Sequence, residues 1–317
     1  MVDTNLFKLN QKTLRVPRDH TYTYYTNSAS RGKPTLILFH GWPDTAKLWA
    51  NVINNYLLPS GYGIIAVDGL GFGDTSKPTS HAEYAFDLLA ADAVAILDAE
   101  QIPTVISVGH DWGSGIAQRL YNFYPTRVSG LGMLNFAYLP PHDPPFEIEA
   151  VLDALRKVFG YGTIEYWKFF VAEDAPRILS ENIKSIYAAA HGSPESWLET
   201  YCAPDGMRNW VSSGKTQQLL QPYAGGSHEA DFVEPNKLVL QENVVVKVPT
   251  LFWGGTRDMV CRPEMLQRSM EAGLLPKLTL KLVDEGHWAL LAKPERFGED
   301  LIQWLEDNFL GVRGVAL

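Results

Sequence analysis

The spacing of apolar and polar positions divides the first half of the chain into alternating strands and helices. Two short β-rich stretches, 12–16 and 21–25, flank a polar turn, and a continuous apolar run follows at 35–39. Such a run is typical of a strand buried on both faces of a parallel sheet. Helical spacing covers 45–57, 86–99 and 114–123, and further strands are predicted at 63–67, 105–108 and 128–134. This alternation predicts a mostly parallel sheet with helices on both faces.

The pattern changes after Tyr138. Four prolines cluster within 140–145, and a helix-rich, aromatic-rich stretch then runs to about residue 243. Apolar strand patterns return at 249–253 and 278–283, and a last helix is predicted over 295–309. We therefore expect a core formed by 1–138 and 244–317, interrupted by a helical lid at 139–243.

The strongest chemical signal lies at a predicted strand-to-helix junction. Residues 108–114 read Val-Gly-His-Asp-Trp-Gly-Ser, so that Gly109 and Gly113 flank Asp111 at two-residue offsets. This is the pattern of a nucleophile elbow, a sharp turn that exposes one side chain above the sheet. A carboxylate is ionised at neutral pH and can open a strained ring or displace a halide, which forms an ester on the enzyme. Asp111 is therefore the predicted nucleophile.

Two later residues complete a catalytic set in the chain order nucleophile, acid, histidine. Asp258 closes the segment Gly-Gly-Thr-Arg-Asp after one predicted strand, and His287 follows the next strand. Asp258 is expected to orient His287, which activates a water for attack on the ester. Asp284 and Glu285 are the competing acids, and Asp258 is preferred because its loop follows the right strand.

A second motif lies directly after the apolar run at 35–39, where residues 40–44 read His-Gly-Trp-Pro-Asp. A turn here can direct the backbone N–H of Trp42 at a developing oxyanion, with the N–H of Trp112 as the second donor. The Xaa-Pro bond in such a turn is a candidate for the cis form. His40 and His110 are interpreted as scaffold residues.

Together these motifs resemble the epoxide hydrolases of the α/β-hydrolase superfamily. The resemblance rests on His-Gly-Trp-Pro at 40–43, Gly-His-Asp-Trp-Gly at 109–113 and Gly-His-Trp at 286–288, and it extends over nearly the whole chain. It implies an α/β-hydrolase fold with an inserted lid. It also implies a hydrolase that opens an epoxide to a vicinal diol through an ester on Asp111, in detoxification or secondary metabolism.

The same resemblance implies two lid tyrosines that donate to the epoxide oxygen. The first is similar to Tyr166, within Tyr-Trp-Lys-Phe-Phe at 166–170. The aromatic motif expected for the second is not found, because the segment 231–243 leads almost directly toward the strand before Asp258. Tyr223 is the nearest tyrosine and is the candidate taken here, with Tyr201 ranked below it.

Composition narrows the possible partners. The formal net charge is −9 and no dense basic run occurs, which argues against a nucleic-acid partner. Two cysteines make no disulfide framework, so both are expected to be free thiols in a reducing compartment. With no secretory signal and no apolar run of about 18 residues, no membrane span is predicted and a cytoplasmic location is expected.

No cofactor and no metal site are predicted. The glycines at 69, 71 and 73 lack the spacing of a dinucleotide-binding loop. The expected partners are a small apolar epoxide and water, for a monomer or homodimer. One alternative is a haloalkane or haloacid dehalogenase that uses the same nucleophile, with the Trp112 indole as one halide donor. The second halide donor, an Asn at the position of Trp42 or a suitable lid Trp, is not evident. Another alternative is a specialised member with altered or lost ring opening.

Overall fold

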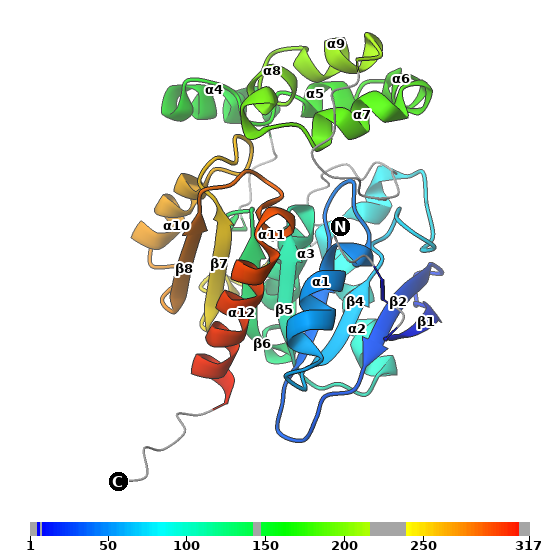
Figure 1. The fold of residues 1–317 in the computed structure, drawn as a ribbon, viewed down its shortest axis with the longest axis vertical. Helices are drawn as coiled ribbons and strands as arrows, with labels where there is room; N and C mark the ends of the chain where they lie inside the picture. Colours follow the sequence, from blue (N-terminus) through cyan, green and yellow to red (C-terminus); the bar gives the residue numbers. More distant parts are fainter. Residues whose placement is uncertain (1–4, 7, 142–146, 216–238, 311–317) are drawn as a thin grey trace.

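The computed structural model describes residues 5–6, 8–141, 147–215 and 239–310. Its centre is an eight-stranded sheet with the order β1-β2-β4-β3-β5-β6-β7-β8 (Figure 1). The β1–β2 and β2–β4 pairs are antiparallel, and all other pairs are parallel. The strands are β1 Asn10–Arg15, β2 Thr21–Asn27, β3 Thr35–Phe39, β4 Gly63–Val67, β5 Val105–His110, β6 Val128–Leu134, β7 Thr250–Gly255 and β8 Leu278–Val283.

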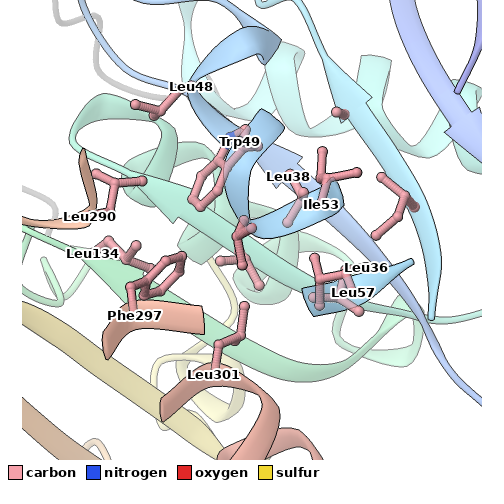
Figure 2. Packing of buried hydrophobic residues seen from close by; sticks show 14 of the residues in the cluster. Leu36, Leu38, Leu48, Trp49, Ile53, Leu57, Leu134, Leu290, Phe297 and Leu301 are labelled. Carbon is pink, nitrogen blue, oxygen red and sulfur yellow. The ribbon is translucent and has the colours of Figure 1, made fainter. Parts of the chain in front are cut away.

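Helices cover both faces of this sheet, as the apolar run of β3 requires. Leu36 and Leu38 join a core with α1 and α12, whereas Ile37 and Phe39 face the opposite core with α2 and α3. Figure 2 shows the first of these cores, where Leu36 and Leu38 lie near residues of the first helical segment and of α12. The helices of the core are α1 Ala50–Val52, α2 Phe86–Ala99, α3 Trp112–Phe123, α10 Gln267–Glu271, α11 Ala289–Ala292 and α12 Pro294–Phe309.

The predicted helix over 45–57 differs from expectation in its backbone. It consists of three successive segments, a 3₁₀ turn Ala46–Trp49, the short α1 and a π turn Ile53–Leu57. Hydrogen bonds accordingly change from three-residue to five-residue spacing along the segment. The apolar side chains still enter the core, so the periodicity identifies the buried face but not the helix type. Shorter turns elsewhere are η3 His81–Tyr84, η4 Pro125–Arg127, η5 Pro194–Ser196, η6 Gln241–Asn243 and η7 Pro263–Leu266.

Six helices lie together over one end of the sheet, at the top of Figure 1. They are α4 Ile148–Phe159, α5 Trp167–Phe170, α6 Ala175–Glu181, α7 Ile183–Ala190, α8 Trp197–Thr200 and α9 Gly206–Ser212. All fall within the segment predicted as a lid, and they share an apolar cluster with the loop after β7. Among the helices that the structure describes, none is both long enough and apolar enough to cross a bilayer.

Candidate active site

The turn between β5 and α3 holds Asp111 at the carboxyl end of the sheet. Asp111 has a positive φ of 54°, which is uncommon for a residue with a side chain. A Cβ on Gly109 would lie 2.1 Å from the carbonyl oxygen of Gly113, and a Cβ on Gly113 would lie 2.2 Å from the carbonyl oxygen of Phe39. Only glycine fits at both positions, and the tight packing they permit keeps the turn in this strained form.

The loop after β3 contacts the Asp111 carboxylate directly. The backbone N–H of Trp42 donates to Asp111 Oδ1 at 3.0 Å, and the Trp42–Pro43 peptide bond is cis. A Cβ on Gly41 would lie 2.3 Å from the same oxygen, so glycine lets the loop approach this closely. Trp112 begins α3, where backbone N–H groups have no partner within the helix. The use of its N–H as a second oxyanion donor stays a prediction.

His287 joins the two aspartates that the sequence singles out. Its Nδ1–H donates to Asp258 Oδ2 at 2.7 Å, and its Nε2 lies 3.5 Å from Asp111 Oδ2. All three side chains are buried, with 6% of Asp111, 1% of Asp258 and 5% of His287 exposed. The structure therefore brings together the predicted nucleophile, acid and base, although they come from distant parts of the chain.

Asp258 is held by more donors than His287 alone. The side chain of Asn135 donates to its Oδ2 at 2.9 Å, and the backbone N–H groups of Val260 and Cys261 donate to its Oδ1 at 3.0 and 2.9 Å. The competing acids lie elsewhere: Asp284 is exposed, and Glu285 pairs with Lys293. Asn135 follows β6 with a φ of 48°, a conformation that asparagine tolerates better than most residues.

The electrostatics of the pair favour an imidazolium beside carboxylates. Burial alone would raise the pKa of Asp258, but the charge and hydrogen bond of His287 and the bonds from Asn135 and Cys261 bring it below its ordinary value. Burial alone would lower the pKa of His287, yet Asp258 and Asp111 together raise it well above 6.5. The two carboxylates therefore stabilise the protonated, imidazolium form of His287.

The two other histidines of these motifs connect loops to one another. His40 Nδ1–H donates to the Gly41 carbonyl at 2.8 Å, and its Nε2 accepts from the Gly69 N–H at 2.9 Å. His110 Nε2–H donates to the His287 carbonyl at 3.0 Å, and burial lowers the pKa of His110 to about 4. Both rings are neutral and tied to backbone groups, in agreement with the scaffold interpretation.

Two tyrosines from the lid face the same pocket as Asp111. Tyr166 and Tyr201 are both buried, and the Tyr166 N–H donates to the Tyr201 carbonyl at 3.0 Å. Burial is the largest cause that raises the pKa of each hydroxyl well above 10, and the negative charge of Asp111 is the second, so both hydroxyls retain their protons. The sequence ranked Tyr201 below Tyr223, and the structure shows that Tyr201 lines the pocket. Tyr223 lies outside the described residues.

A local signal could have identified Tyr201. Trp197 lies four residues before it, and the two rings stack with centroids 4.2 Å apart, while Trp197 also lies 5.0 Å from the His287 ring. Residues four apart on a helix share one face. An aromatic pair at this spacing therefore indicates a lid face turned toward the catalytic residues, which a search for one fixed motif overlooks.

Asp111, His287, Tyr166 and Tyr201 line one cavity of about 270 Å³. Its wall is formed mainly by aromatic and aliphatic side chains, and Glu147 is an additional acidic residue of the lining. Apolar walls with a few placed polar groups are typical of small-molecule sites. The apolar lining residues are Trp42, Trp112, Ile148, Trp167, Phe170, Val171, Trp197, Val260 and Trp288.

The fold and the site define a member of a known class. The sequence family described as alpha/beta hydrolase fold matches residues 34–294, and the chain belongs to that family. Its curated relatives carry a more specific name. It is 28% identical over 295 residues to bifunctional epoxide hydrolase 2 of Mus musculus, which covers 86% of this chain and 52% of the relative. The chain thus spans about half the length of that relative.

Other relatives match over most of their length. The chain is 25% identical over 299 residues to epoxide hydrolase A of Mycobacterium tuberculosis, covering 86% of this chain and 91% of the relative. The solved structure of an epoxide hydrolase from an endophytic Streptomyces has a TM-score of 0.69 and 18% identity, covering 94% and 95% of the two chains. At that identity the structural likeness shows the fold alone. The predicted fold class and the resemblance to epoxide hydrolases are confirmed.

Proposed function

We propose that this protein hydrolyses epoxides to vicinal diols through a covalent ester on Asp111. The observation that carries the proposal is the convergence on one pocket of the Asp111 carboxylate, the His287 ring 3.5 Å from it and the hydroxyl-bearing Tyr166 and Tyr201. This set holds a nucleophile, a base and proton donors. The names of the relatives support the same activity.

In the first step Asp111 Oδ2, which lies on the His287 side, attacks an epoxide carbon. The carbon–oxygen bond of the ring breaks, and the oxygen takes a proton from Tyr166 or Tyr201. A protonated hydroxyl near the ring oxygen lowers the barrier because an unprotonated alkoxide is a poor leaving group. The high pKa that burial and Asp111 impose keeps both hydroxyls protonated until the strongly basic alkoxide forms and takes a proton. The products are an alkyl ester on Asp111 and a tyrosinate.

Esterification changes the state of the base. Asp111 loses the negative charge that helps to raise the pKa of His287, so that pKa falls. The proton that His287 then releases restores the tyrosine hydroxyl, and the neutral ring takes a proton from water. The resulting hydroxide attacks the ester carbonyl.

The oxyanion forms at the Oδ1 position, where Trp42 already donates at 3.0 Å, with Trp112 as the second proposed donor. The ester bond breaks at the carbonyl carbon, and the diol departs with the former carboxylate oxygen. Its second hydroxyl proton comes from the newly formed carboxylic acid, which returns Asp111 to its ionised state.

Isotope labelling tests this route. One turnover in ¹⁸O-water should leave the diol unlabelled and place the label in Asp111, detected by mass spectrometry of its peptide. His287→Gln should accumulate an enzyme whose mass is increased by that of the epoxide, and Asp111→Asn should form no adduct. Label in the diol after a single turnover, or an adduct on another residue, contradicts the covalent route.

The cavity suggests a neutral, apolar substrate body. Several tryptophans surround the space, and the Glu147 carboxylate lines it, which disfavours anionic substrates. We therefore expect aryl-substituted epoxides to be turned over with higher kcat/KM than epoxides that carry a carboxylate. Glu147→Gln should reduce that preference, and equal reduction of kcat/KM for both substrates would contradict the charge argument.

The alternatives remain testable with the same variants. Halide leaves a carbon without needing a proton, so a dehalogenase gains nothing from the two buried tyrosine hydroxyls, and this favours an epoxide. Halide release from haloalkanes without epoxide turnover would support the dehalogenase. Tight ligand binding that is unaffected by Asp111→Asn, with no turnover across an epoxide panel, would support a repurposed member.

A further inference from the structure

A cysteine thiol that can act as a metal ligand lies beside the proposed nucleophile and base. The Cys261 Sγ, one Asp111 carboxylate oxygen and one His287 nitrogen all lie within 4.8 Å of one another, and all three residues are buried. His287 Nε2 and Asp111 Oδ2 are 3.5 Å apart. Cys261 is a free cysteine, and no step of the proposed reaction uses its thiol.

We propose that this pocket binds a single zinc-type divalent cation through Asp111, Cys261 and His287, and that the bound cation blocks hydrolysis. A carboxylate, a thiolate and an imidazole are the ligands that zinc selects, at about 2.0–2.3 Å. Two such ligands of a tetrahedral ion lie about 3.4–3.6 Å apart by these bond lengths. The separation of Asp111 and His287 already has this value. The distances from the Cys261 Sγ to the other two atoms are at most 4.8 Å, so each must shorten by about 1.2 Å or less.

The groups around the three proposed ligands, Asp111, Cys261 and His287, also suit a zinc-type cation. Asp258 accepts the Nδ1–H of His287 at 2.7 Å, which leaves Nε2 as the coordinating nitrogen. A carboxylate behind a zinc-bound histidine orients the ring and raises its basicity. Because Asp111 and His287 line the cavity, the fourth position of a tetrahedral ion opens toward it and can hold water.

Binding requires deprotonation and releases protons to solvent. Burial raises the pKa of the Cys261 thiol to about 12, so the thiol is protonated until the cation displaces its proton. His287 likewise gives up its second proton. The cation adds two positive charges, and the thiolate and Asp111 supply two negative charges, so the bound site is neutral apart from Asp258. No redox change or further reactant is involved.

Occupation of the site would remove both the nucleophile and the base from the reaction. Inhibition rests on the proposed function, whereas cation binding does not. We therefore separate the two readouts. The first is direct binding to the full-length protein in chelator-free buffer, measured by calorimetry with zinc chloride and by absorbance with cobalt chloride. The second is epoxide hydrolysis during a zinc titration.

Two cysteine variants form a matched pair. Cys202 is the other buried thiol, and its Sγ lies 3.5 Å from the Met259 carbonyl rather than in the triad. Cys202→Ala should keep one-to-one binding and the thiolate-to-cobalt charge-transfer band, which then has Cys261 as its only cysteine source. Cys261→Ser should lose the band and weaken zinc binding and inhibition by at least about tenfold, with inhibition expressed relative to the zinc-free turnover of the same variant.

The outcomes decide the proposal even if a variant folds poorly. One-to-one binding with the cobalt band in the unsubstituted protein and in Cys202→Ala supports the site. Absence of the band, or zinc affinity that is unchanged in Cys261→Ser, overturns it. Cation binding in a protein that hydrolyses no epoxide would keep the cation site and reject the proposed function. Hydrolysis that is insensitive to saturating zinc would reject the inhibitory site alone.

Discussion

The rings of Tyr166 and Tyr201 meet edge to face, with centroids 4.8 Å apart and an angle of 70° between their planes. The backbone of Tyr166 also donates to that of Tyr201, so the two lid segments are joined at this point. In the proposed reaction, a substrate oxygen placed over Asp111 would therefore meet two proton donors from one unit. The lid would then take part in the reaction rather than only cover the site.

Removing either hydroxyl should slow ring opening. We expect Tyr166→Phe and Tyr201→Phe each to lower kcat about tenfold to a hundredfold and the double variant about a thousandfold, since general acid catalysis contributes roughly 10²–10⁴-fold. Single-turnover measurements should show slower formation of the ester with unchanged ester hydrolysis. A purely structural role would slow both steps or change only KM.

Two further tyrosines serve as comparisons. Tyr161 belongs to the lid, and its hydroxyl lies 3.6 Å from the Met259 sulfur instead of lining the cavity, so Tyr161→Phe should leave kcat within about twofold. Tyr223→Phe tests the candidate preferred from the sequence. A larger loss in Tyr223→Phe than in Tyr201→Phe would return the second donor to Tyr223.

The charge on Asp111 should control the ionisation of His287. Asp111→Asn removes one of the interactions that raise the pKa of His287, whereas Asp258, the largest stabilising partner, remains. We expect NMR titration of the His287 ring to give a lower pKa in Asp111→Asn than in the unsubstituted protein. The ring signals of His110, neutral in both proteins, provide the comparison. An unchanged His287 pKa would contradict the proposed release of its proton after esterification.

The Asp258–His287 pair should stabilise the fold over a defined pH range. The pKa of His287 is raised on folding, so its contribution is complete below 6.5 and is lost as pH rises through the folded pKa. The pKa of Asp258 is lowered, so its contribution is complete above 3.8 and is lost as pH falls through the folded pKa. The difference in unfolding free energy between the unsubstituted protein and Asp258→Asn should therefore be largest between these values. A difference that is flat with pH would refute the linkage.

Asn135 should act through Asp258. Removal of the Asn135 side-chain amide takes away its buried hydrogen bond to the Asp258 carboxylate, which is worth about 1–3 kcal/mol of unfolding free energy. Asn135→Gly removes the amide but accepts the positive φ of 48°, whereas Asn135→Ala adds backbone strain. We expect both variants to lose activity to a similar degree and Asn135→Ala to be the less stable in chemical denaturation. Full activity in Asn135→Gly would show that the bond has no positioning role.

The elbow glycine should be intolerant of a single methyl group. Gly109→Ala places a Cβ 2.1 Å from the Gly113 carbonyl oxygen, and relief of that overlap requires backbone movement costing about 1–3 kcal/mol or more. Gly69→Ala is the matched control, because its nearest neighbour lies 3.5 Å away and its φ is not positive. Thermal unfolding compares the two variants. Equal melting temperatures would mean that the turn is not closely packed.

The parts of this protein that the sequence by itself determined are those with local causes. The glycines around Asp111 are required by contacts within one turn, and β3, β4 and β6 have the bounds predicted from apolar runs. Asp258 and His287 follow strands in the chain order of the fold, so their roles could be predicted without coordinates. The helical stretch 45–57 shows the limit, because apolar spacing identifies a buried face but not the hydrogen-bond pattern.

Only the tertiary structure decided which other groups converge on these three residues. Asn135 and Cys261 carry no local mark, since Asn135 meets Asp258 and the Cys261 thiol meets Asp111 across segments distant in sequence. The Trp197–Tyr201 spacing marks a shared aromatic face, but only the tertiary structure turns that face toward Asp111. Lid helices pack on the loops after β3, β7 and β8, and this packing places the Tyr166–Tyr201 pair in the same cavity as Asp111. Long-range packing depends on the shapes of both partners at once, so no single stretch of sequence contains it.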